Sequence, residues 1–182
     1  MIALVIGHRE SSQGASGGDV TEWRYNSGLA ALVLSELRAE GISSTIVERP
    51  DRRSGYSELP SILNEIEPTL ILSLHLNASA HESASGACAL YWHRSSIGKR
   101  LASRLSAEVA AALDLRDRGA ISRREGDRGA PLLQRSVAPC VIAEPAFVSN
   151  DDDRAKLLSM QGALATAYAT ALADVYREQR DG

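Results

Sequence analysis

The chain has few of the features that identify several common classes of protein. It has only two cysteines, Cys88 and Cys140, without a C-x-x-C pattern. Both lie in apolar stretches, so we expect buried small side chains rather than redox or metal-binding thiols. An excess of positive charge is also missing, because the formal net charge is −3. We therefore expect no nucleic-acid partner and no anionic membrane partner.

Long hydrophobic runs are absent as well. No apolar stretch is long enough for a transmembrane helix. The segment Met1–Ile6 is too short for the hydrophobic region of an export signal and has no basic residues before it. No repeat with a period of about 20 to 50 residues occurs, which argues against a solenoid. The sequence thus predicts a chain without a membrane span, an export signal or repeats.

The remaining pattern is that of one α/β domain. No linker interrupts the 182 residues, so we expect a single domain over residues 1–182. Strands are expected at 1–7, 42–47, 69–76, 86–92 and 139–143, helices at 22–40, 59–66, 98–115 and 151–178, and loops at 9–20 and 116–129. This alternation predicts a mainly parallel, twisted β-sheet with helices on both faces.

Three of the expected strands end in side chains that can bind metal or carry protons. His8 follows the first apolar run, His75 ends the run Leu70–His75, and Glu144 follows Cys140–Ala143. The carboxyl ends of parallel strands line the ligand crevice of such a sheet. Zinc prefers imidazole and carboxylate ligands, and a catalytic zinc site keeps one position open. The pattern therefore predicts a mononuclear zinc hydrolase with Zn²⁺ as cofactor.

A third zinc ligand is expected at Glu22. A carboxylate in the first turn of a helix beside the first strand can lean over the end of that strand, where it also suits the positive end of the helix dipole. The alternative is that Glu22 is an ordinary first-turn acid that only stabilises its helix.

The region around these residues resembles the zinc-dependent N-acetylmuramoyl-L-alanine amidases, a family that cleaves peptidoglycan. The matching stretches, which together span almost the whole chain, are Ile6-Gly-His8, Glu22, Ser73-Leu-His75-Leu-Asn77-Ala78 and Ala143-Glu144-Pro-Ala-Phe147-Val-Ser-Asn150. The resemblance implies that His8, Glu22 and His75 are the zinc ligands and that Glu144 is the catalytic carboxylate. Two departures, Arg9-Glu10 and Pro145-Ala146, stand where the family usually has glycine, and they affect the rim rather than the ligand set.

The resemblance also implies the reaction: hydrolysis of the amide between N-acetylmuramic acid and L-alanine, with peptidoglycan or a muropeptide as substrate. Glu144 would accept a proton from water and pass it to the departing amine nitrogen. The alternative is that Glu144 is a surface acid at a strand end. Other candidate functions are a zinc amidohydrolase or carboxypeptidase-like enzyme for small N-acylated amino acids, and a catalytically inactive wall-binding module. Binding alone has no need of a positioned proton carrier, which argues against the module.

The expected place of action is the cell wall, although no export signal is recognised. A phage-type lysin, synthesised in the cytoplasm and released through a membrane lesion, would reconcile the two, and so would a signal already removed. No motif specifies an oligomeric state.

Two further features have open roles. His81 lies in a polar loop, where it either contacts substrate or is simply solvated. His93 is a weaker candidate for a functional role. The segment Arg116–Arg128 holds five arginines interleaved with acids. It is either an internally paired surface loop or a recognition element for the carboxylates of the stem peptide.

Overall fold

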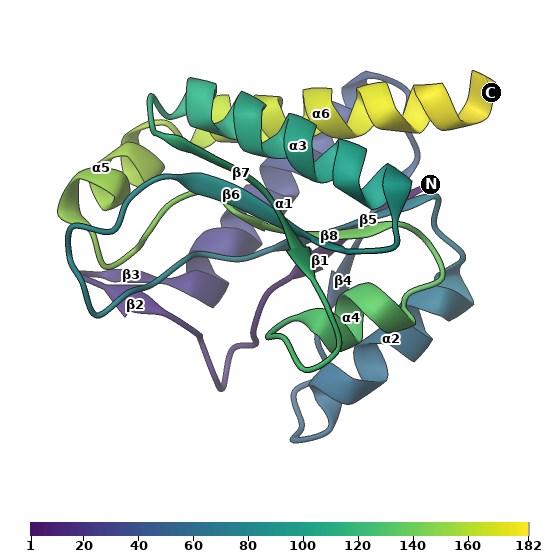
Figure 1. The fold of residues 1–182 in the computed structure, drawn as a ribbon, viewed down its shortest axis with the longest axis horizontal. Helices are drawn as coiled ribbons and strands as arrows, with labels where there is room; N and C mark the ends of the chain where they lie inside the picture. The colour runs from purple at the N-terminus through teal and green to yellow at the C-terminus, as the bar shows by residue number, and fades with distance from the viewer. Residues whose placement is uncertain (182) are drawn as a thin grey trace.

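The computed structural model describes residues 1–181 and confirms the predicted α/β fold with a mainly parallel sheet (Figure 1). The strands are β1 (Ile2–Ile6), β2 (Ser16–Gly17), β3 (Val20–Thr21), β4 (Ser44–Glu48), β5 (Leu70–Leu74), β6 (Ala87–Trp92), β7 (Asp117–Arg123) and β8 (Cys140–Glu144). The helices are α1 (Glu22–Ala39), α2 (Gly55–Ile66), α3 (Ser96–Ala112), α4 (Ala130–Arg135), α5 (Asp151–Ser159) and α6 (Gln161–Asp181).

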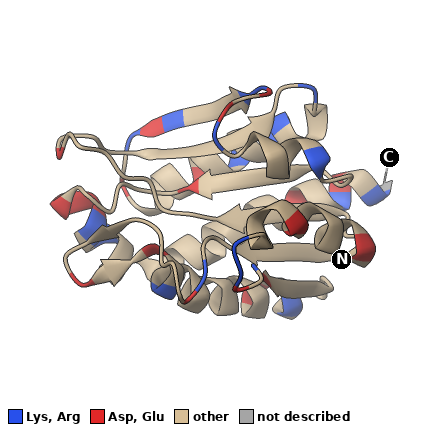
Figure 2. Ribbon diagram, turned by 90° about the horizontal axis from the view of Figure 1, so that it is seen from below, with Lys and Arg blue, Asp and Glu red and all other residues tan. Residues whose placement is uncertain are grey.

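Six strands form the main sheet in the order β4-β1-β5-β8-β6-β7. The first four in this order are parallel, β6 runs antiparallel to β8, and β7 is parallel to β6. Strands β1 and β5 are buried along their whole length, which explains their unbroken apolar sequences. Charged residues lie on the helices, the loops and the edge of the sheet, while the central strands carry almost none (Figure 2).

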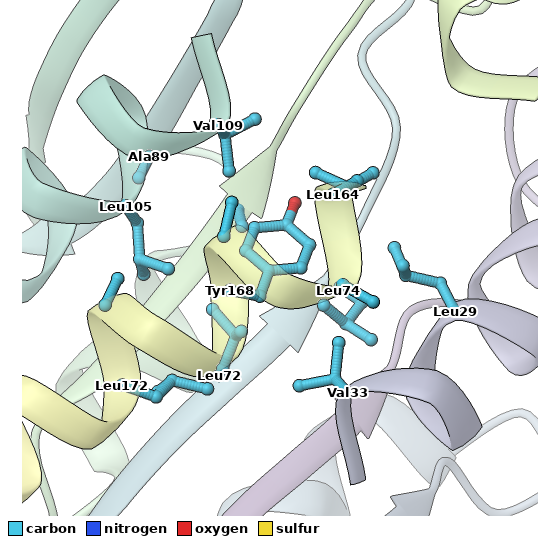
Figure 3. Close-up of a cluster of buried hydrophobic side chains, with 14 of the residues drawn as sticks. Leu29, Val33, Leu72, Leu74, Ala89, Leu105, Val109, Leu164, Tyr168 and Leu172 are labelled. Carbon is cyan, nitrogen blue, oxygen red and sulfur yellow. The ribbon is translucent and has the colours of Figure 1, made fainter. Parts of the chain in front are cut away.

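Helices cover both faces of the sheet, as predicted. One hydrophobic cluster joins the sheet to α1, α3 and α6, with Tyr168 of α6 fully buried at its centre (Figure 3). Leu29, Val33 and Leu37 form the buried face of α1 at intervals of four residues. A smaller cluster packs α2 and α4 against the opposite face. Within residues 1–181, no helix combines the length and the apolar composition that crossing a bilayer requires.

Four parts of the fold differ from the sequence expectation. The expected loop at 9–20 contains the short antiparallel pair of β2 and the start of β3, two strands too short to give a periodic sequence signal. The expected loop at 116–129 contains β7, an edge strand whose charged sequence lacks an apolar run; charges are common on edge strands because they prevent sheet-to-sheet aggregation. The expected single helix at 151–178 is two helices, α5 and α6, which meet at Met160. The short helix α4 was not expected at all.

Candidate metal centre

Two adjacent parallel strands bring His8 and His75 together. The register pairs Ile6 of β1 with Leu74 of β5, so the residues that follow each strand leave the sheet side by side. The two imidazole rings lie with their centroids 5.5 Å apart. His8 has a left-handed backbone with φ 66°, which turns the chain sharply where it leaves β1.

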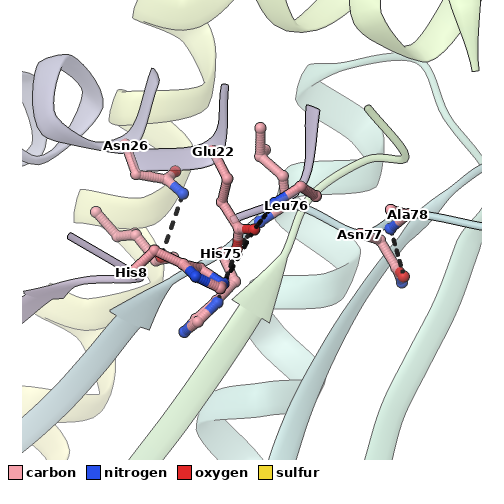
Figure 4. A network of polar contacts seen from close by, with 9 residues as sticks. His8, Glu22, Asn26, His75, Leu76, Asn77 and Ala78 are labelled. Atoms are coloured by element: carbon pink, nitrogen blue, oxygen red, sulfur yellow. Dashed lines mark hydrogen bonds and ion pairs between the residues drawn. The ribbon is translucent and has the colours of Figure 1, made fainter. Parts of the chain in front are cut away.

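Glu22 reaches both histidines from the first residue of α1 (Figure 4). Its Oε2 lies 3.2 Å from His8 Nε2, and its Oε1 lies 2.8 Å from His75 Nδ1. One ligand atom from each of the three residues lies within 4.8 Å of the other two. The structure therefore brings together the three residues that the sequence nominated as ligands.

Two backbone amides hold the Glu22 carboxylate in place. Ala15 N–H donates to Oε2 at 2.8 Å, and Leu76 N–H donates to Oε1 at 3.0 Å. The side chain is only 1% exposed. Burial raises the pKa of Glu22, but the hydrogen bonds and charge of His75, together with these amides, outweigh burial and hold the pKa below its usual value. Glu22 is thus a buried carboxylate, unlike an ordinary solvated acid in a first helical turn.

The three side chains suit a metal ion chemically. Metal binding needs neutral imidazoles and an ionised carboxylate. Burial lowers the pKa of His8, against the opposing charge of Glu22, and so favours its neutral form. Ions such as zinc bind nitrogen and oxygen at about 2.0–2.2 Å, which requires donor atoms within a few ångströms of one another. The His8, Glu22 and His75 group meets this requirement and could hold one metal ion.

Glycine is required at Gly14 because the chain passes directly over the candidate ligands. A Cβ at this position would collide with the Glu22 carboxylate and the His8 ring, and the backbone is left-handed with φ +80°. Gly41 has a similar φ of +71°, but among residues 1–181 an added Cβ would have no atom within 4 Å other than those of its chain neighbours. An alanine at either position would strain the backbone, but only an alanine at position 14 would also crowd the candidate ligands. Comparing the two substitutions therefore distinguishes the two effects.

We expect Gly14→Ala to lower the amount of bound metal by about tenfold or more, the usual effect of disturbing groups that orient metal ligands. Gly41→Ala should cost only about 1–2 kcal/mol of stability from its left-handed backbone and should leave metal content unchanged. Metal analysis and thermal denaturation of both variants measure these effects. Equal metal content in both would show that Gly14 does not shape the site.

Glu144 ends β8 beside the candidate metal centre. The backbone N–H of His75 donates to the Ala143 carbonyl at 3.0 Å. Glu144 is the next residue after Ala143, so this hydrogen bond places it beside the end of β5. On the other side of β8, Glu144 pairs with Cys88 of β6. Burial raises the pKa of the Glu144 carboxyl, although His75 and Arg128 oppose the change. A carboxyl in such surroundings is suited to holding a proton.

A cavity of about 530 Å³ opens next to these groups and is lined by His8, His75 and Glu144. Its rim is built by the two segments that follow β5 and β8. Asn77 N–H donates to the Ala146 carbonyl at 3.0 Å, and Val148 N–H donates to the Asn77 carbonyl at 2.8 Å. This pairing brings together two sequence motifs that are far apart in the chain.

The remaining histidines lie outside the cavity, whereas Cys88 is one of its lining residues. His81 and His93 are exposed and do not line the cavity. Cys88 and Cys140 are both buried, as predicted. Burial raises the pKa of Cys88 to about 11 and that of Cys140 to about 12, so both thiols are protonated at neutral pH.

One structural residue of the rim was not recognised from the sequence. Asp153 is fully buried, and its carboxylate accepts hydrogen bonds from the Phe147 and Gly86 amides at 2.8 and 3.2 Å and from Ser85 Oγ at 2.5 Å. It thereby joins the segment after β8 to the loop before β6. A run of three aspartates at the start of a helix is also the ordinary pattern of first-turn acids, so no sequence signal distinguishes Asp153.

Comparison with known proteins identifies related sequences. A family model described as N-acetylmuramoyl-L-alanine amidase matches residues 2–174. The N-acetylmuramoyl-L-alanine amidase LytC of Bacillus subtilis (strain 168) is 29% identical over 153 residues, which cover 83% of this chain and 30% of LytC.

Solved structures share the fold. Cwp6 from Clostridium difficile superimposes with a TM-score of 0.85 at 25% identity, covering 96% of this chain and 29% of that chain. The catalytic domain of CwlV, an N-acetylmuramoyl-L-alanine amidase from Bacillus (Paenibacillus) polymyxa var. colistinus, gives a TM-score of 0.84 at 20% identity, with 97% of both chains covered. The chain therefore spans less than a third of the length of LytC and of Cwp6, and nearly all of the CwlV catalytic domain.

Proposed function

Because the chain belongs to the N-acetylmuramoyl-L-alanine amidase family, we propose that it hydrolyses the amide bond between N-acetylmuramic acid and L-alanine in peptidoglycan. The observation that supports this most is that His8, Glu22 and His75 lie together and that two of them, His8 and His75, line the same cavity as Glu144. In this proposal residues 1–182 form one catalytic domain, and its place of action is the cell wall, where the substrate lies. Release as a phage-type lysin would be one route to that place.

His8, Glu22 and His75 would hold one zinc ion in this proposal. A bound zinc ion would polarise the amide carbonyl and make water a stronger acid and nucleophile. The chain contributes the rigid placement of the ligands: two neighbouring strand ends fix the imidazoles, and the Ala15 and Leu76 amides fix the Glu22 carboxylate.

Glu144 would act first as the general base and then as the general acid of the reaction. Its carboxylate accepts a proton from the attacking water as the new C–O bond forms, and it delivers a proton to the alanine nitrogen as the C–N bond breaks. The products are the lactyl carboxylic acid on the glycan and a free alanine amine. The raised pKa of Glu144, caused first by burial, helps the carboxyl to keep the proton until the nitrogen takes it.

End-group analysis of a peptidoglycan digest tests the proposed bond. We expect new amino termini, all of them alanine, without new reducing sugar ends, because the cut separates peptide from glycan and leaves the glycan chain intact. The zinc-loaded protein and a chelator-treated sample should be compared in parallel.

Other end groups would contradict the proposal. New reducing ends would indicate a glycosidase, which needs a pair of carboxylates for its own chemistry. Amino termini other than alanine would indicate an endopeptidase. A parallel assay on small N-acylated amino acids should show much slower hydrolysis; faster hydrolysis of these compounds than of peptidoglycan would favour an amidohydrolase for small substrates.

A further inference from the structure

The cavity beside the candidate metal centre carries an excess of positive charge. Four arginines line it: Arg49 after β4, Arg118 and Arg123 on β7, and Arg128 in the loop before α4. Among the described residues, Glu144 is the only acidic side chain in the lining. Strand β7 and the loop beyond it, a segment expected from the sequence to be a loop, thus contribute three of the four arginines and form one wall of the cavity.

These arginines have no close acidic partner among the described residues, although burial raises the pKa of the Glu144 carboxyl and the charges of Arg128 and Arg123 oppose that rise. Within residues 1–181, none of the four forms an ion pair with a carboxylate. The acids interleaved with them act elsewhere, since Asp127 accepts from the Arg124 backbone N–H at 2.7 Å and Asp117 accepts from the Gly119 N–H at 2.8 Å. The interpretation that the arginines of this loop pair with its own acids is therefore wrong for the arginines that line the cavity.

Two of the guanidinium groups have unused donors. The Nε atoms of Arg49 and Arg123 are buried without a hydrogen-bond partner among the described residues. A buried donor without an acceptor costs free energy, which a ligand can recover by supplying the acceptor. Carboxylates match the guanidinium group well because both are planar and form paired hydrogen bonds.

Two of the arginines in the lining also stack on aromatic rings. The Arg49 guanidinium lies over the Tyr56 ring, with Cζ 5.2 Å from the ring centroid. Arg118 lies over Phe147, with Cζ 4.8 Å from the centroid. These contacts restrict the two side chains before any ligand arrives, which lowers the entropy cost of binding.

The chemistry of the proposed substrate indicates which part of it would meet these arginines. The glycan has no free carboxylate at the cleavage site, because the lactyl carboxyl of muramic acid is itself part of the amide to be cut. The peptide that leaves carries the free carboxylates. We propose, on the basis of the proposed function, that Arg49, Arg123 and Arg128 bind carboxylates of the leaving peptide and make the enzyme selective for stem peptides whose carboxylates are not amidated.

The pairing of the strands shows how far Arg123 lies from Glu144 along the cavity wall, and this distance suits an extended peptide. Glu144 pairs with Cys88 of β6, whereas Arg123 pairs with Trp92, four residues further along the same strand. At about 3.3 Å per residue, the two positions are separated by roughly 13 Å along the strand. This distance corresponds to a few residues of extended peptide, so Arg123 is placed for a carboxylate beyond the alanine.

A pair of substrates that differ only in their carboxylates tests the inference. Peptidoglycan stripped of attached anionic polymers is treated with carbodiimide and ammonia, which converts the free carboxylates to amides without cutting the scissile bond; the matched sample is mock-treated. Release of alanine amino termini at low substrate concentration reports kcat/KM. We expect the wild-type protein to cleave the untreated sample at least about tenfold faster than the amidated one.

Arginine variants assign the preference to this wall. In Arg49→Gln and Arg123→Gln the ratio between the two substrates should fall to less than about threefold. Arg124→Gln is the matched control, since it removes the same charge at the next residue, does not line the cavity and should keep the wild-type ratio. A purely structural role would lower both rates and leave the ratio unchanged, and that result would overturn the inference.

The outcomes separate this inference from the proposed function. Equal cleavage of both samples by the wild-type protein, with alanine amino termini released, would overturn the inference and leave the amidase activity standing. No release from either sample would overturn both.

A binding measurement that does not depend on turnover uses two stem tetrapeptides in calorimetric titrations: L-alanyl-γ-D-glutamyl-L-lysyl-D-alanine with free carboxylates, and the same peptide with its carboxylates amidated. The first should bind about tenfold more tightly, and Arg123→Gln should remove the difference. Equal affinities for the wild-type protein would contradict the inference.

Discussion

The Glu144→Gln protein should fold and bind metal normally while hydrolysing peptidoglycan at least about 100-fold more slowly. Glutamine has nearly the same shape as glutamate but cannot carry the proton from water to the leaving nitrogen. Burial raises the pKa of Glu144, which means that the ionised carboxylate opposes folding above its unfolded-state pKa. Removing that charge should therefore leave the variant at least as stable near neutral pH.

Three measurements on this variant are needed together: thermal denaturation, metal content and the rate of alanine release. Glu125→Gln is the matched control, because Glu125 is an exposed acid that does not line the cavity. It should keep the wild-type rate. If Glu144→Gln retained more than about a tenth of that rate, the proton carrier would have to be another group.

Removal of either histidine ligand should have a comparably large effect, this time on metal. His8→Ala and His75→Ala should each bind zinc at least about tenfold more weakly and lose activity with it, because two remaining ligands do not complete a zinc site. Added zinc should raise the melting temperature of the wild-type protein, since a ligand that binds only the folded state stabilises it. The two variants should show little of this increase.

The other two histidines provide the controls for this experiment. His81→Ala and His93→Ala remove exposed imidazoles outside the cavity and should keep the zinc-dependent rise in melting temperature. Unchanged metal content in both His8→Ala and His75→Ala would contradict the assignment of these residues as ligands.

The sheet and the two histidines could be predicted because their sequence signals are local. Buried parallel strands have unbroken apolar sequences, and β1 and β5 both show them directly before His8 and His75. Strand ends that follow such runs meet at one edge of a parallel sheet, so the proximity of the two imidazoles followed from the topology alone.

Other parts of the site depend on contacts that no local pattern encodes. Strand β7 has one neighbour and a charged sequence, so it could not be distinguished from a loop. Arg49 became part of the cavity only through the position of β4, and the buried state of Asp153 depends on the loop before β6. The need for glycine at position 14 arises from contact with Glu22 and His8, which is a tertiary effect.

The position of β8 in the sheet also has a consequence for the order in which the protein is assembled during synthesis. This strand emerges late from the ribosome yet lies between β5 and β6, so the strands made earlier stay in two separate parts, β4-β1-β5 and β6-β7, until it arrives. His8, Glu22 and His75 all belong to the part of the chain made first, whereas Glu144 is the last residue of β8. Since chains begin to fold from the N-terminus as they are made, a growing chain can gather its metal ligands before it has any means of hydrolysing a substrate.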